Sequence, residues 1–151
     1  MRIYLVVIDE SPEAEIALRF AARRAVKTGG GVEILALLPP QEFIAFGGVQ
    51  ATIEEEARHQ AEALVERAAG ALFVESGLTP AITVLEGEGP KVIRDAIAGN
   101  GQIAALVLGA AASGAPGALV TAFTGADAGA LRVPIMVVPG SLSPEEIDRL
   151  S

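Results

Sequence analysis

The stretch IYLVVIDESPEAEIALRFAARRAVKTGG (residues 3–30) decides the fold, because it passes from an apolar run through a short turn into a helical pattern. Residues 3–8 are a continuous apolar run rich in Val, Ile and Leu, which is typical of a strand buried on both faces. Ser11 and Pro12 then form a helix start signal, and Gly29 supplies the stop. This order predicts the first β-α unit of a parallel sheet.

The same alternation continues along the chain. Four further short apolar runs, which we also expect to be strands buried on both faces, lie at 32–38, 81–85, 103–108 and 134–138. The helices expected between them span about 52–76, opened by the capping box Thr52-Ile53-Glu54-Glu55 and ended by Gly77, then 91–98 and about 117–131. The order predicts an α/β fold with a five-stranded, mostly parallel sheet, right-handed crossovers and helices on both faces.

Length and composition limit the kind of protein. The chain has 151 residues, enough for one domain with a core, and it contains no internal repeat or linker. The absence of cysteine excludes disulfides, thiolate chemistry and cysteine-based metal sites. A net charge of −8 without a basic stripe argues against nucleic acid as a partner. The opening residues do not have the pattern of a signal peptide, so we expect a cytoplasmic protein.

The segment 96–126 has no charged side chain and includes LGAAASGAPGALVTAFTG (108–125). It is long enough for a membrane span, but Gly109, Gly114 and Gly117 lie inside it and weaken a helix. We therefore expect no membrane contact. The alternative is a glycine-rich loop after the fourth strand, which lets a ligand approach the main chain. A tightly packed or flexible loop of small residues explains the same pattern without a ligand.

A second candidate ligand-binding segment is the turn after the first strand. In open parallel sheets, ligands bind beyond the carboxyl ends of the strands where the strand order reverses. Asp9 follows the first strand directly and can accept hydrogen bonds, while Ser11 begins a helix whose amides favour an anion. The alternative is that Asp9 only caps the turn and Ser11 only caps its helix. The residues by themselves leave both interpretations open.

Catalytic and metal sites are not expected. His59 lies alone in a charged helical pattern, with no cysteine or second histidine to complete a metal site or a catalytic pair. Ser113 has no nearby histidine and no nucleophile-elbow pattern, so hydrolase chemistry has no support. No general base with a partner is visible, and we expect a protein that binds or regulates without catalysis.

Three stretches together resemble a known family. They are VVIDESPEAEIALRFAARRA (6–25), EGEGPKVIRDAIA (86–98) and LGAAASGAPGALVTAFTGADAGALRVPIMVV (108–138). The first resembles the opening of the universal stress protein family, whose first strand ends in a V-D-x-S-like turn. The others resemble its third-helix entry and its fourth strand, glycine loop, helix and final strand. We therefore expect a universal stress protein domain at 1–140 and a tail at 141–151, where Ser143-Pro144-Glu145-Glu146 predicts a short helix.

This resemblance implies a Rossmann-like, adenine nucleotide alpha hydrolase-like sheet of order 3-2-1-4-5, a homodimer and, in one branch, adenine-nucleotide binding. The nucleotide-binding branch has the pattern G-x2-G-x9-G-[S/T]. Counted from Gly109, the later positions of this pattern are Ala112, Ala122 and Phe123, so only the first glycine matches. No Lys or Arg occurs between Arg94 and Arg132 to hold phosphates. ATP is therefore expected to bind only modestly better than AMP.

The resemblance and the two segments together define a candidate nucleotide site. We expect Val7, Leu37 and Leu108 to form an adenine-sized slot with Asp9. Backbone amides and hydroxyls would form hydrogen bonds with the rest of the nucleotide. These come from Ser11, Gly109, Ser113, Gly114, Gly117, Thr124 and Gly125.

The final apolar run, Pro134-Ile135-Met136-Val137-Val138, is expected at an edge of the sheet, and no charged residue occurs in 133–143 to protect it. A two-fold mate pairing the same strand antiparallel would cover this edge. The alternative is that the C-terminal helix of the same chain covers it and leaves a monomer. For function, we expect a universal stress protein-like regulator that binds ATP or AMP; the alternative is an interaction protein that acts through its dimer surface or the loop 41–51.

Overall fold

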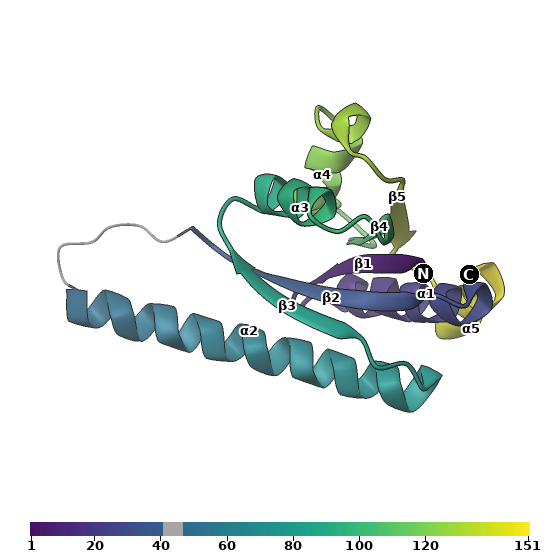
Figure 1. Cartoon of the computed structure of the whole chain (residues 1–151), viewed down its shortest axis with the longest axis horizontal. Helices are drawn as coiled ribbons and strands as arrows, with labels where there is room; N and C mark the ends of the chain where they lie inside the picture. Colours follow the sequence, from purple (N-terminus) through teal and green to yellow (C-terminus); the bar gives the residue numbers. More distant parts are fainter. Residues whose placement is uncertain (41–46) are drawn as a thin grey trace.

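The computed structural model describes the backbone of residues 1–40 and 47–151 and the side chains of residues 1–40 and 52–151 (Figure 1). Five parallel strands form one sheet in the order β3-β2-β1-β4-β5, which confirms the predicted order. The strands are β1 (Ile3–Ile8), β2 (Gly31–Leu38), β3 (Ala81–Glu86), β4 (Ile103–Ala110) and β5 (Ile135–Pro139). A Rossmann-like arrangement follows, with the strand order reversing at β1.

Helices cover both faces of the sheet, as predicted. They are α1 (Pro12–Thr28), α2 (Gly47–Ser76), α3 (Gly89–Ala98), α4 (Ala118–Thr124) and α5 (Pro144–Leu150), with a 3₁₀ turn η1 (Ala128–Ala130). Figure 1 shows α2 on one side of the sheet and α3 with α4 on the other. One buried cluster joins the sheet to α1, α2 and α5, and a second joins it to α3 and α4.

The side chains of the inner strands alternate between these two clusters. Val6 and Ile8 belong to the cluster under α1 and α2, whereas Leu5 belongs to the one under α3 and α4. The expectation that all five strands are buried on both faces was wrong for the two edge strands. Ile82 of β3 is 45% exposed and Val137 of β5 is 37% exposed. Each edge strand has a neighbour on one side only, so helices cover it incompletely.

The limits of α1 agree with the sequence, whereas α3 begins at Gly89 rather than at Lys91, and α2 and α4 differ more from their predictions. Of the loop predicted at 41–51, residues 41–46 lie outside the described part of the chain. The backbone of residues 47–51 is helical, not a loop. The start of α2 was therefore predicted too late, because Gly47 and Gly48 carry no local helix signal. The fourth helix was predicted too long, because Gly125 leaves the helical region at φ −105° and ψ −120°.

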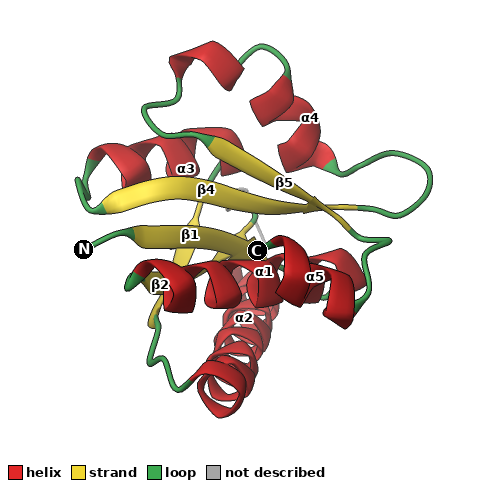
Figure 2. Cartoon of the chain, turned by 90° about the vertical axis from the view of Figure 1, so that its right-hand side faces the viewer, coloured by secondary structure: helices red, strands yellow, loops and turns green. Residues whose placement is uncertain are grey.

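The predicted C-terminal helix is present and packs against α1 (Figure 2). Ser143 and Glu146 form a reciprocal capping box at its start, and Ile147 is fully buried. Arg19 of α1 donates two hydrogen bonds to Asp148, from Nε at 3.0 Å and Nη2 at 2.8 Å. These bonds hold the pKa of the Asp148 carboxyl below its usual range. Side-chain contacts therefore attach α5 to the helix layer of the sheet.

No helix in the described part of the chain combines the length and the apolar character needed to cross a bilayer.

Candidate functional site

A small cleft of about 170 Å³ lies at the carboxyl ends of β1 and β4, where the strand order reverses. The structure brings six of the predicted site residues together around it: Val7, Asp9, Ser11, Leu108, Gly109 and Gly117. The turn after β1, the first turn of α1 and the start of α4 supply the remaining wall. The cleft therefore occupies the position at which open parallel sheets bind ligands.

Asp9 and Ser11 hold each other in the turn after β1. The Ser11 amide donates to Asp9 Oδ1 at 2.8 Å, and the Ser11 hydroxyl donates to the same oxygen. The Ser11 hydroxyl also accepts a hydrogen bond from the Ala14 amide at 3.3 Å and so caps α1. Both residues therefore have the capping roles considered from the sequence. Within the described residues no hydrogen bond reaches Asp9 Oδ2, which leaves that oxygen able to accept one from a ligand.

Gly109 lies in β4 rather than in the loop that follows it. A Cβ on this residue would lie 2.2 Å from the backbone oxygen of Glu13, in the first turn of α1. Gly140 is close to the same turn, since its Cβ would lie 3.0 Å from Glu13 Cβ. The missing side chain at Gly109 is thus explained by the close approach of α1 to the sheet, without a ligand.

The glycines of the following loop have a different environment. Gly114 and Gly117 adopt φ angles of +75° and +118°, and an added Cβ on either would meet nothing within 4 Å. The loop is closed by the Ala111 amide, which donates to the Pro116 carbonyl at 3.1 Å. Gly117 contributes to the cleft, whereas Ser113 and Gly114 are exposed and lie outside its lining.

Three other predicted residues are not brought to the cleft. The Thr124 hydroxyl donates to the Val120 carbonyl at 2.6 Å, and Gly125 follows it at the far end of α4. The cleft lining takes Ala118, Leu119 and Val120 from the first half of α4, and neither Thr124 nor Gly125 is part of it. Leu37 is not among the lining residues either; it lies near Gly89, whose added Cβ would be 3.4 Å from Leu37 Cδ1.

The charge of the cleft does not suit a chain of phosphates. Among the described residues that line it, the charged side chains are Asp9 and Glu13, and none is Lys or Arg. Glu13 was missed from the sequence, although its place in the first turn of a helix that starts at the cleft is a usable signal. The lining combines apolar side chains with the Asp9 carboxylate. The volume is below the usual 300–1,000 Å³ of a small-molecule pocket, roughly enough for one ring system.

Comparison with known proteins settles the family. The model of the universal stress protein family matches residues 1–139. The chain belongs to this family. No match among curated protein sequences reaches significance.

Solved universal stress proteins share the fold of this one at low sequence identity. UspA from Lactobacillus plantarum superposes with a TM-score of 0.71 at 17% identity, over 91% of this chain and 97% of that one. A universal stress protein from Archaeoglobus fulgidus in complex with dAMP gives 0.60 at 21%, over 91% and 97% of the two chains. A further universal stress protein structure, in complex with cAMP, gives a TM-score of 0.64 at 12% identity, over 93% of this chain and 98% of that one.

Proposed function

We propose that this universal stress protein binds an adenine nucleotide with its base in the cleft at the ends of β1 and β4, and acts as a regulator without catalysis. The observation that carries the proposal is the convergence of Val7, Leu108 and Asp9 on this cleft. The apolar side chains of Val7 and Leu108 suit the faces of a purine. The Asp9 carboxylate can accept a hydrogen bond from an exocyclic amine or a ribose hydroxyl. Relatives of the same fold have been solved in complex with dAMP and with cAMP.

The phosphates contribute little to binding in this proposal. The cleft is too small for a whole nucleotide, so the base occupies it and the phosphates lie at the open rim. There they face the carboxylates of Asp9 and Glu13 without a basic side chain from the cleft lining. Each added phosphate therefore gains no charge-assisted hydrogen bond from a side chain, a contact usually worth about 1.5–3 kcal/mol. ATP then binds at most about tenfold better than AMP.

Titration calorimetry with adenosine, AMP and ATP tests this proposal. Asp9→Ala should weaken the binding of all three by a similar factor. Asp95→Ala is the control, because Asp95 is also an exposed carboxylate and lies on α3, where it pairs with Lys91 away from the cleft. Unchanged affinity in Asp9→Ala would sink the site assignment. A thousandfold preference for ATP over AMP would instead overturn the argument about phosphates.

A second candidate function, association with another copy of the chain, is favoured by the exposed edge of β5. Val137 is 37% exposed there, and α5 packs against α1. We propose that a two-fold mate pairs its β5 antiparallel with this strand, which would satisfy the free edge amides and carbonyls. An interaction function then does not require a nucleotide.

A further inference from the structure

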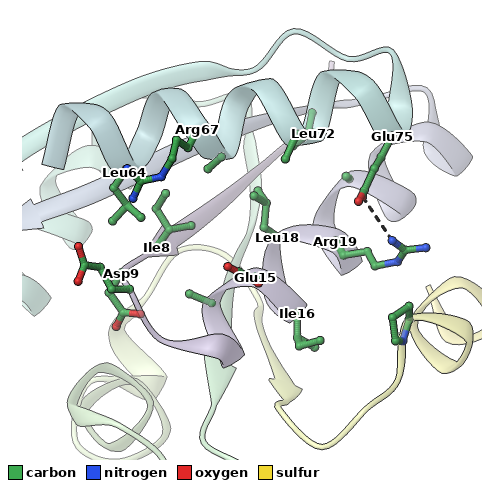
Figure 3. A pocket seen from close by; sticks show the side chains of 16 residues that line it. Ile8, Asp9, Glu15, Ile16, Leu18, Arg19, Leu64, Arg67, Leu72 and Glu75 are labelled. Atoms are coloured by element: carbon green, nitrogen blue, oxygen red, sulfur yellow. Dashed lines mark ion pairs between the residues drawn. The ribbon is translucent and has the colours of Figure 1, made fainter. Parts of the chain in front are cut away.

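A larger cavity, of about 760 Å³, lies between α1 and α2, on the face of the sheet opposite α3 and α4 (Figure 3). Its volume is within the range of about 300–1,000 Å³ that small-molecule pockets usually have. Ile8 of β1 and Leu18 of α1 form one apolar wall, and Leu64 and Leu72 of α2 form the facing wall. The nucleotide proposal uses none of these apolar side chains.

The space exists because small residues occupy the facing surfaces of the two helices. Ala14 and Ala22 line the cavity from α1, and Ala68 and Ala71 line it from α2. Packed helices normally fill the space between them with larger, interlocking side chains. Four alanines at these positions therefore leave a gap with apolar walls that side chains of the two helices do not fill.

The two ends of the cavity differ in charge. At one end Arg19 Nη1 lies 3.4 Å from Glu75 Oε2, an ion pair that links α1 to α2 (Figure 3). Arg19 is also bound to Asp148 at 2.8 Å, so its charge is already compensated. This end offers little net attraction for an ion of either sign.

The opposite end is acidic. Asp9 lies at this end with Glu10 next to it in the chain, and Glu15 lines the cavity from the first turn of α1, between Asp9 and Leu18. Arg67 of α2 is the cation on this side among the described lining residues (Figure 3). Three carboxylates against one guanidinium leave an excess of negative charge beside an apolar space. The net charge of the whole chain, −8, adds to the attraction for a cation.

We propose that this cavity binds an apolar molecule that carries an ammonium group. The apolar part lies between Leu18 and Leu64, where it is removed from water, and the ammonium group lies at the Asp9, Glu10 and Glu15 end. An anionic molecule of the same shape meets the excess carboxylates and binds less tightly. This site is separate from the nucleotide cleft, although Asp9 and Ala14 line both.

Three probes with the same apolar part distinguish the charge classes: 4-phenylbutylamine, 4-phenylbutan-1-ol and 4-phenylbutanoate. Calorimetry on the full chain should show the amine bound at least about tenfold more tightly than the acid, with the alcohol between them. Added salt should weaken the binding of the amine and leave the binding of the alcohol nearly unchanged. Equal binding of the three, tighter binding of the acid, or no amine binding up to about 5 mM overturns the proposal.

Substitutions test the place of binding. Ala68→Leu adds bulk inside the cavity and should abolish amine binding, whereas Ala63→Leu on the exposed side of α2 should not change it. Amine affinity that is unchanged in Ala68→Leu places the probe elsewhere and overturns the proposal. AMP binding by the same variants should be unchanged, because Ala68 does not line the cleft. The amine and AMP titrations therefore test the two sites separately.

A charge variant gives the same information if Ala68→Leu fails to fold. Glu10→Gln combined with Glu15→Gln removes two carboxylates at exposed positions and should weaken the amine about four- to twentyfold, without affecting the alcohol. Glu62→Gln with Glu66→Gln, on the exposed side of α2, is the matched control for net charge. If both double variants lose the same amine affinity, the loss comes from the net charge of the chain. That result overturns the placement of the ammonium group at the Asp9 end.

Discussion

Replacement of Gly109 by alanine should destabilise the fold, and this prediction separates a packing role from a ligand-binding role. The added Cβ would lie 2.2 Å from the Glu13 oxygen and 2.6 Å from its carbonyl carbon. Ordinary contacts begin near 3.4 Å, so α1 and β4 have to separate by about 1 Å. Both sides of this contact are backbone, so no rotamer change relieves it. We expect the upper end of the usual cost of overpacking, about 3 kcal/mol.

Urea unfolding followed by circular dichroism measures this effect. Gly70→Ala is the control, because Gly70 lies inside α2 with nothing within 4 Å of an added Cβ. That substitution should stabilise the protein by about 0.5–1 kcal/mol through helix propensity. If Gly109→Ala stays within about 0.5 kcal/mol of the wild type, the close approach of α1 to β4 does not explain this glycine.

Two further predictions concern the C-terminal helix and the sheet edge. Because Arg19 lowers the pKa of Asp148 in the folded state, the stability from this contact is complete above the unfolded pKa of about 4 and is lost as pH falls through the folded value. Asp148→Asn should therefore lower the melting temperature at neutral pH and make it fall less as the pH is lowered. If the melting temperatures of the two proteins change with pH in parallel, the contact with Arg19 does not contribute this stability. If β5 pairs two copies of the chain as proposed, Val137→Lys should convert this dimer to a monomer in sedimentation experiments. A wild-type chain that is already monomeric at tens of micromolar would refute the proposed pairing.

The central part of the fold could be predicted because its signals are local. The apolar run of β1, the Ser11-Pro12 cap and Gly29 lie next to one another in the chain, and each fixes one boundary of the first β-α unit. The start of α2 could not be predicted in this way, because Gly47 and Gly48 favour no helix by themselves.

The candidate site was only partly predictable, since it depends on contacts between distant segments. Val7, Asp9 and Leu108 come together because parallel strands end at one edge, which the strand order alone implies. The role of Gly109 depends on its contact with Glu13, a residue far away in the sequence that no glycine pattern identifies. Thr124 was assigned to the site because its hydroxyl lies in a segment without charged side chains, but in the fold this hydroxyl donates to the Val120 carbonyl.

The contacts of Gly109 and Gly140 with Glu13 also determine how the cleft can change size. These two glycines hold the first turn of α1 directly against the ends of the sheet, so this wall has no room to yield. The opposite wall begins at Gly117, where an added Cβ would meet nothing within 4 Å. If a base binds in the cleft as proposed, we expect residues 111–117 to move and the first turn of α1 to stay in place. Amide hydrogen exchange should accordingly change in this segment on binding and stay constant at residues 12–15.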